Sequence, residues 1–179
     1  MVQCRSFNAF VNRGQIMTAK LNFVRQQGFP DASPETCSYL YPALMWQPRV
    51  IGILFLVGLA FQAASFFLAL GALLWWNAIF PAFNPFDAIY NLVAKPKSVP
   101  RLLPAPAPRR FAQAEAGTVI AAIGLALLGE VNLLAYILEG LALASLGALI
   151  FGRFCQGSYL YLLFTGQSAV ANRTLPWSA

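Results

Sequence analysis

The chain has 179 residues, of which 59% are hydrophobic and only 10% are charged, and its formal net charge is +6. Soluble domains carry roughly 25% charged residues, so this composition excludes an ordinary soluble domain and favours an integral membrane protein. It also argues against nucleic acid as a partner, because a nucleic-acid-binding surface needs many exposed cations and the cations here lie beside apolar runs.

Residues 1–49 mix polar and aromatic side chains, and they are predicted to form an N-terminal extension on the cytoplasmic face. The opening stretch MVQCRSFNAFVNRGQI has no apolar core of the length that a cleavable signal peptide requires, so no signal peptide is expected there. The first long apolar run begins only after Arg49.

Two apolar regions follow, residues 50–94 and residues 111–152. One crossing of a bilayer takes about 20 apolar residues in a helix, so each region predicts a hairpin of two transmembrane helices. The approximate spans are 50–70, 72–94, 111–129 and 132–152. The first turn is expected near Gly71, Trp75 and Trp76, and the second at the sequence Gly-Glu-Val-Asn, residues 129–132.

The second predicted crossing is interrupted by Pro81, Asn84, Pro85 and Asp87. Proline removes a helix hydrogen bond and bends the chain, and broken backbone at membrane depth needs protein or water around it. This segment is therefore either a kinked crossing or a short re-entrant turn followed by a helix.

The cations indicate how the chain is threaded. All twelve fall before the first hairpin, in the proline-rich basic loop of residues 95–110, or in the C-terminal segment of residues 153–179. Cytoplasmic flanks collect Lys and Arg, and four crossings place every cation on one side. The sequence therefore predicts an all-α, four-helix, multi-pass protein of the bacterial inner membrane, with both termini in the cytoplasm.

Small residues recur every four positions along the last predicted helix, at Gly140, Ala144, Ala148 and Gly152. Such a stripe lets two helix backbones approach closely in a membrane. It is interpreted first as an internal packing face, with a docking face for another subunit as the alternative.

Five polar residues are candidates for roles within the membrane: Glu139, Gln62, Ser65, Asp87 and Arg153. Glu139 lies about two turns into the last crossing, near the membrane centre, with Gln62 and Ser65 as partners at a similar depth. A structural hydrogen bond is the first interpretation of Glu139, and a ligand or proton role is the alternative. Asp87 is expected to form a salt bridge between the hairpins with Arg153 or Arg110.

The three cysteines, Cys4, Cys37 and Cys155, show no paired spacing, and the chain has no histidine. A zinc site needs about four nitrogen or sulfur ligands, so no metal site is predicted. The absence of histidine excludes His-ligated haem or chlorophyll on this chain, and no other cofactor is specified. No catalytic residues are predicted.

The segment FGRFCQGSYLYLL resembles the closing motif of a bacterial integral membrane family of unknown function, domain of unknown function 4395. The last helix of that family ends with Phe-Cys-x-Gly-Cys and an aromatic residue. Phe154, Cys155 and Gly157 match this motif, whereas Ser158 stands where the second cysteine is expected. A lone thiol cannot cycle between dithiol and disulfide as close pairs do. Cys155 is therefore interpreted as a buried small residue, with a working thiol as the alternative.

A second motif of the same family, an aromatic entry to the third helix that contains Arg-Phe, resembles PRRFAQ at residues 108–113. The resemblance covers roughly residues 48–165 and implies four membrane helices with a proline-rich central connection.

Together these features predict a non-enzymatic accessory or scaffold subunit that packs within a larger membrane complex, with respiratory and photosynthetic complexes as candidates. Its expected partners are the lipid bilayer and other membrane subunits. A small transporter or channel is the alternative, because an interrupted helix with Asn84 and Asp87 is typical of helices that line binding sites. A membrane thiol-redox protein is the third hypothesis.

Overall fold

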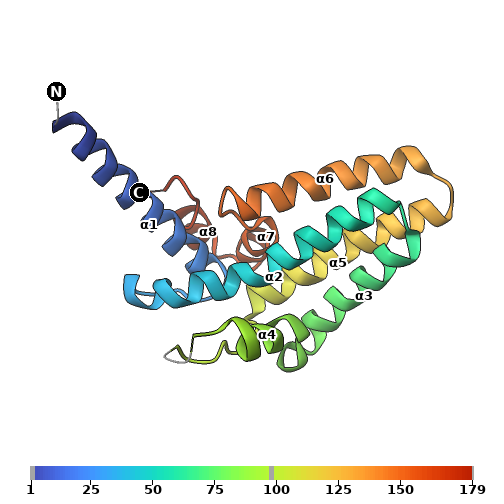
Figure 1. Cartoon of the computed structure of the whole chain (residues 1–179), viewed down its shortest axis with the longest axis horizontal. Helices are drawn as coiled ribbons and strands as arrows, with labels where there is room; N and C mark the ends of the chain where they lie inside the picture. The colour runs from blue at the N-terminus through green and yellow to red at the C-terminus, as the bar shows by residue number, and fades with distance from the viewer. Residues whose placement is uncertain (1–2, 97–98, 179) are drawn as a thin grey trace.

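The computed structural model describes residues 3–96 and 99–178, and for residues 3–14 and Ala94 it describes the backbone alone. The predicted all-α class is confirmed, since these residues form helices and no strands (Figure 1). The side chains of Cys4, Arg5, Arg13 and Lys97 lie outside this description. In chain order the elements are α1 (Gln3–Gln26), α2 (Pro34–Phe61), α3 (Ala64–Ile79), η1 (Pro81–Phe83), α4 (Pro85–Ile89), η2 (Tyr90–Ala94), α5 (Ala107–Leu128), α6 (Asn132–Ile150), α7 (Gln156–Phe164) and α8 (Ser168–Arg173).

Three of the described helices, α2, α5 and α6, are long and apolar enough to cross a membrane. Helix α3 is apolar but has only 16 residues, or about 24 Å at 1.5 Å per residue, against a hydrocarbon core of about 30 Å. These four helices run side by side, and the α2–α3 and α5–α6 turns both lie at the end of the bundle away from the termini (Figure 1).

Helix α2 begins well before the predicted boundary at residue 49. The Oγ of Ser33 accepts a hydrogen bond from the backbone N–H of Thr36 at 3.2 Å, and Pro34 occupies the first turn. Both features are typical of a helix start. The helix then continues through Pro42 and Pro48 into the apolar run, so part of the predicted extension and the first crossing form one element.

The first hairpin turn lies at Gln62 and Ala63, and not near Gly71 as predicted. Gln62 adopts a left-handed conformation with φ 47° and Ala63 is extended, which ends α2 and starts α3. A non-glycine residue at positive φ is uncommon, so the sequence gives little warning of this turn. The second turn, in contrast, falls between Leu128 and Asn132, where it was predicted.

Gly71 lies inside α3 because that helix packs closely against α5. A Cβ atom at Gly71 would lie 2.9 Å from the backbone oxygen of Gly117, and one at Gly124 would lie 2.9 Å from the backbone oxygen of Ala64. Side chains do not fit at such distances, so glycine permits the contact. We call Gly71, Gly117 and Gly124 the glycine seam.

The chain breaks after α3. Phe80 ends the helix, a short 3₁₀ turn follows, and Asn84 caps α4 by accepting from the backbone N–H groups of Phe86 at 3.0 Å and Asp87 at 3.5 Å. A π-helical turn, η2, then leads to Lys95. The predicted interruption thus places Asp87 at the start of a short capped helix beside the bundle.

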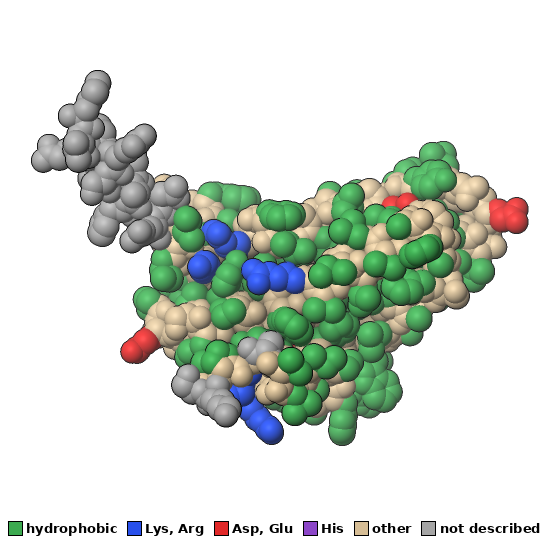
Figure 2. Space-filling view, in the orientation of Figure 1, with side chains coloured by type: hydrophobic (Ala, Val, Ile, Leu, Met, Phe, Trp, Pro, Cys, Tyr) green, Lys and Arg blue, Asp and Glu red, His purple; other side chains and the backbone are tan. Residues whose placement is uncertain are grey.

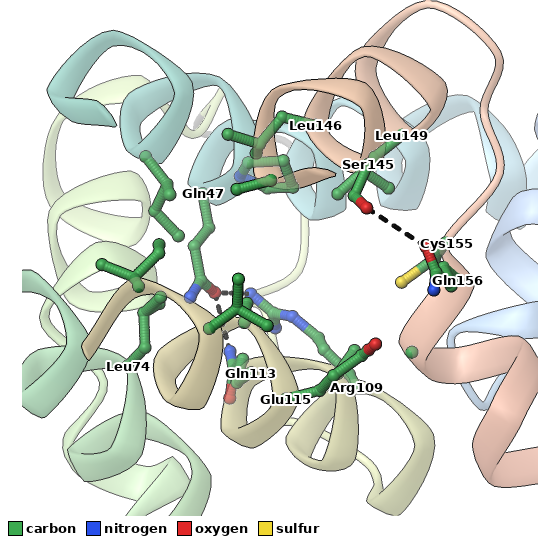
Figure 3. A pocket seen from close by; sticks show the side chains of 18 of the residues that line it. Gln47, Leu74, Arg109, Gln113, Glu115, Ser145, Leu146, Leu149, Cys155 and Gln156 are labelled. Carbon is green, nitrogen blue, oxygen red and sulfur yellow. Dashed lines mark hydrogen bonds between the residues drawn. The ribbon is translucent and has the colours of Figure 1, made fainter. Parts of the chain in front are cut away.

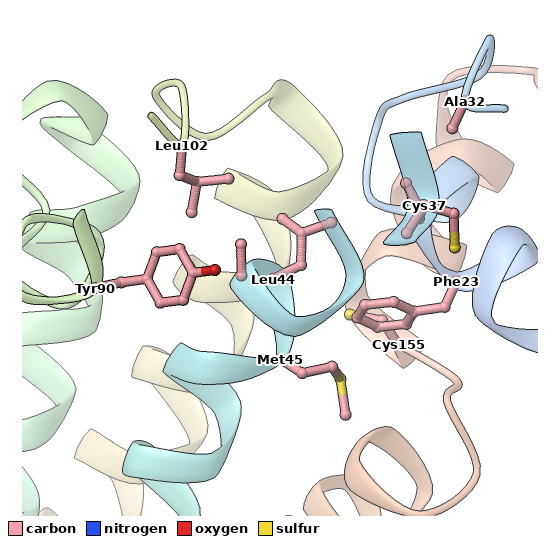
Figure 4. Packing of buried hydrophobic residues seen from close by; sticks show 10 residues of the cluster. Phe23, Ala32, Cys37, Leu44, Met45, Tyr90, Leu102 and Cys155 are labelled. Atoms are coloured by element: carbon pink, nitrogen blue, oxygen red, sulfur yellow. The ribbon is translucent and has the colours of Figure 1, made fainter. Parts of the chain in front are cut away.

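Two apolar clusters hold the fold together. One fills the bundle between α2, α3, α5 and α6 and includes Phe55, Phe67 and Ile123. The other lies at the end that carries the termini, where Phe23 of α1, Leu44 of α2 and Leu102 of the proline-rich connection belong to one cluster (Figure 4). On the face that Figure 2 shows, hydrophobic side chains cover the bundle and Lys and Arg gather at this same end.

Candidate functional site

A buried ion pair joins α4 to α5. The guanidinium of Arg109 donates from Nη2 to Oδ1 of Asp87 at 2.6 Å and from Nη1 to Oδ2 at 3.0 Å. Asp87 is 6% exposed and Arg109 is 4% exposed. A two-point arginine–carboxylate contact is strong and directional, so this pair fixes the position of the short helix α4 against the bundle.

The predicted partners of Asp87 were wrong. Arg110 donates from Nε to the backbone oxygen of Ala78 at 2.7 Å, and Arg153 donates from Nε to the hydroxyl of Tyr41 at 3.3 Å. Neighbouring residues of a helix point about 100° apart, since 3.6 residues make one turn. Only one of two consecutive arginines can therefore face Asp87, and it is Arg109.

Three amides complete the cluster around the ion pair. Oε1 of Gln47 on α2 accepts from Nη2 of Arg109 at 2.7 Å, from Nε2 of Gln113 at 2.9 Å and from Nδ2 of Asn84 at 3.3 Å. Nδ2 of Asn84 also donates to Oδ2 of Asp87 at 3.1 Å. We call these five residues the polar lock, because they join α2, α4 and α5 inside an apolar bundle.

Sequence reasoning missed most of the polar lock. It named Asp87 and Asn84 but gave no role to Gln47, Arg109 or Gln113. A signal was present, since Arg109 and Gln113 are four residues apart and therefore share one helix face. Both also belong to the PRRFAQ segment that carries the family resemblance. Gln47 gives no comparable signal before α2 is known to extend across it.

A cavity of about 290 Å³ lies between α2, α5, α6 and the start of α7. Figure 3 shows Gln47, Arg109 and Gln113 on one side of it, with Ser145, Cys155 and Gln156 grouped on the other. The remaining wall is largely aliphatic, with side chains from all three long helices. The exposed lining residues Ala116 of α5 and Leu141 of α6 mark its opening between these two helices.

Glu139 lies near the middle of α6 and is not part of the polar lock. Its Oε1 accepts from Nε2 of Gln62 at 3.1 Å. Glu139 is buried, whereas Gln62 and Ser65 are exposed at the α2–α3 turn. Because Glu139 lies seven residues into the 19-residue helix α6, it is about 10 Å from the helix start and only about 3 Å from the helix midpoint. The predicted position near the membrane centre stays a prediction. The bond ties α6 to the end of α2.

The small-residue stripe of α6 faces outward. Gly140, Ala144 and Gly152 are exposed and Ala148 is partly exposed. A Cβ atom added at Gly140 would meet nothing within 4 Å. Gly152 lies just beyond the helix end. The internal packing interpretation was therefore wrong, because the close helix contact inside the bundle uses the glycine seam instead.

Cys155 is buried in the cluster at the terminal end of the molecule, as Figure 4 shows, and it also lines the cavity. Its backbone N–H donates to Oε1 of Gln26 at 2.9 Å. Cys37 belongs to the same cluster, and both are free thiols. In the described part of the chain, no group of three His, Cys, Asp or Glu residues has the arrangement of a metal site.

Ser158, which replaces the expected second cysteine, is buried and hydrogen bonded on both sides. Its Oγ accepts from Nε2 of Gln27 at 3.1 Å and donates to the backbone oxygen of Pro108 at 3.3 Å. The hydroxyl therefore connects α7 to α1 and to the start of α5. A position that could hold a second thiol serves here as a structural bridge.

Comparison with protein families identifies the family of this chain. The family described as a domain of unknown function, DUF4395, matches residues 42–165. The chain belongs to the DUF4395 family. The matched region starts within α2 and ends just after α7, so it contains the whole polar lock and leaves α1 and α8 outside. No curated protein and no solved structure matches the chain.

Proposed function

We propose that this DUF4395 protein is a non-enzymatic accessory or scaffold subunit of a larger membrane complex, and that it docks through α6. The observation that carries the proposal is the outward-facing stripe of Gly140, Ala144 and Ala148. Small residues gain nothing against lipid tails, whereas they let the backbone of a second helix approach closely. The expected occupant of this face is a transmembrane helix of another subunit.

The proposed threading has four crossings in a bacterial inner membrane, with α3 and the segment after it forming the second. Both hairpin tips, at Gln62–Ala63 and at Gly129–Val131, contain no cation. Arg49, Arg109 and Arg153 lie toward the other end of the bundle. This distribution supports cytoplasmic termini, because cytoplasmic flanks collect cations.

Site-specific photo-crosslinking tests the docking proposal. A benzoylphenylalanine at Ala144 is expected to crosslink to a different membrane protein in native membranes. The matched control is the same group at Leu125, which is 61% exposed on α5 and lies away from the stripe. Equal crosslinking at both positions, or a product with twice the mass of this chain, contradicts docking to a different subunit.

A small transporter is the second candidate, and the cavity favours it. The cavity reaches Arg109, which holds Asp87 at the interrupted crossing. Cysteines placed at Val119 and Leu138, in a chain without its native cysteines, test this function. Labelling by a membrane-impermeant thiol reagent from both sides of the membrane supports a transport path, and protection from both sides contradicts it.

A further inference from the structure

The cavity has two chemically different parts. Val119 and Ile120 of α5 face Leu138, Leu141 and Leu146 of α6 across an aliphatic slot. At its inner side lie the amides of Gln47 and Gln113 and the guanidinium of Arg109 (Figure 3). Polar groups grouped at one side of an apolar pocket fix the orientation of a bound molecule. Here the arrangement suits a molecule with a polar head and an apolar tail.

Two lining side chains have polar atoms without a partner among the residues that the structure describes. They are Nε2 of Gln47, a donor, and Oε1 of Gln113, an acceptor. Gln47 is 2% exposed and Gln113 is 6% exposed, so both amides are buried. Buried polar groups are almost always hydrogen bonded. These two atoms are themselves buried, so a head group that both accepts and donates hydrogen bonds satisfies them once the two amides turn toward the cavity.

The charges of the lining favour an uncharged head group. Arg109 is the cation among the lining residues, and both of its terminal nitrogens already bond Asp87. An anionic head group would have to compete with that carboxylate. Glu115 is the acid of the lining, and its Oε2 packs against Gly157 at the side of the cavity remote from Gln47.

We propose that the cavity binds one uncharged, single-chain amphiphile of the monoacylglycerol class, taken from the adjacent leaflet. Its ester carbonyl accepts from Nε2 of Gln47, and a glycerol hydroxyl donates to Oε1 of Gln113. Its acyl chain leaves between Ala116 and Leu141. The volume of about 290 Å³ lies near the lower limit of small-molecule sites, which fits the head and the first part of one chain.

Photoaffinity labelling in nanodiscs tests this site. The probe is monooleoylglycerol with a diazirine and an alkyne in its chain, and the labelled residues are mapped by mass spectrometry. Labelling at Leu141 is expected to exceed labelling at Leu125 at least fivefold, although both side chains are exposed. Unlabelled monooleoylglycerol is expected to compete, whereas phosphatidylglycerol and oleylamine are not.

Two tryptophan variants separate the cavity from ordinary contact with lipid. Ala116→Trp blocks the opening and is expected to reduce the Leu141 signal at least fivefold. Thr118→Trp places the same ring on another exposed face of α5 and is expected to change the signal less than twofold. Equal loss in both variants, or no loss in either, overturns the proposal.

The head-group class has its own test. Glu115→Gln is expected to change labelling less than twofold, because an uncharged head group makes no ion pair with Glu115. Loss of labelling in this variant together with competition by oleylamine would show a cationic ligand, and stronger competition by phosphatidylglycerol would show an anionic one. Either result overturns the assignment. Ala144→Trp, which blocks the proposed docking face, is expected to leave labelling unchanged, so the two proposals can fail separately.

Discussion

The glycine seam between α3 and α5 and the stripe of α6 are both made of small residues. The seam faces another helix of the same chain, whereas the stripe faces outward. At the seam, a Cβ at Gly71 would lie 2.9 Å from atoms of α5. At the stripe, a Cβ at Gly140 meets nothing within 4 Å. A pattern of small residues therefore indicates where another helix can pack closely. Whether that helix belongs to the same chain or to another chain depends on the packing of the bundle.

The largest expected effect comes from breaking the polar lock. Arg109→Ala leaves Asp87 buried without its cation and is expected to lower the free energy of unfolding by about 3–5 kcal/mol. The measurement is an unfolding titration in detergent, followed by tryptophan fluorescence. The double variant Asp87→Leu with Arg109→Met is expected to recover most of this loss, because apolar side chains of similar volume often replace a buried pair without cost.

A matched pair of substitutions tests the comparison of the two glycine surfaces directly. Gly71→Ala is expected to destabilise the chain by about 1–3 kcal/mol, as overpacking of a close contact does. Gly140→Ala is expected to stabilise the isolated chain by about 0.5–1 kcal/mol, because alanine is the better helix former. Equal effects of the two changes in the same unfolding titration contradict the assignment of one closed and one open surface.

Removing the hydroxyl of Ser158, at the end of the bundle that carries the termini, is expected to have a smaller effect on stability. Ser158→Ala leaves Nε2 of Gln27 buried without its acceptor and is expected to cost about 1–2 kcal/mol. The control is Ser145→Ala, whose hydroxyl lies on an exposed part of α6 and whose loss is expected to stay within about 0.5 kcal/mol. A Ser158→Ala variant as stable as its control would show that this bridge is dispensable.

The smallest expected effect concerns Glu139, near the middle of α6. Glu139→Gln keeps the size of the side chain and can still accept from Gln62, so a loss of about 1 kcal/mol or less is expected from one altered hydrogen bond. Glu139→Leu removes the acceptor and is expected to be the less stable variant. The comparison uses the same titration, and a larger loss for Glu139→Gln would indicate that the charge of Glu139 matters.

The sequence predicted the helical class, two crossings close to α5 and α6, and the second turn, because these follow from hydropathy and from turn residues. Of the other two predicted crossings, residues 50–70 overlap only the second part of α2, and residues 72–94 are interrupted after α3. Sequence reasoning did not predict the first turn, since Gln62 adopts a left-handed conformation that its residue type rarely favours. It also assigned the wrong arginine to Asp87. Arg109 and Arg110 are chemically identical neighbours, and only the rotation of α5 within the bundle distinguishes them.

The same limit applies to the candidate sites. Spacing showed that Gly140 and Ala144 share a helix face, but it could not show which way that face points. The cavity was also beyond sequence reasoning, because its lining comes from helices far apart in the chain. Hydropathy indicates whether a segment favours an apolar or an aqueous environment. The residues that each helix face contacts depend instead on the packing of the whole bundle.

The central claim is that the stripe of α6 holds another subunit, and the size of the extracted protein tests it most directly. Membranes are dissolved in a mild detergent, and native gel electrophoresis is used to compare the wild-type chain with Ala144→Trp and Leu125→Trp. The account predicts that the wild type and Leu125→Trp migrate in a complex much larger than the chain, and that Ala144→Trp migrates alone. Identical migration of all three as a single chain, or as one complex that Ala144→Trp does not disturb, would contradict it.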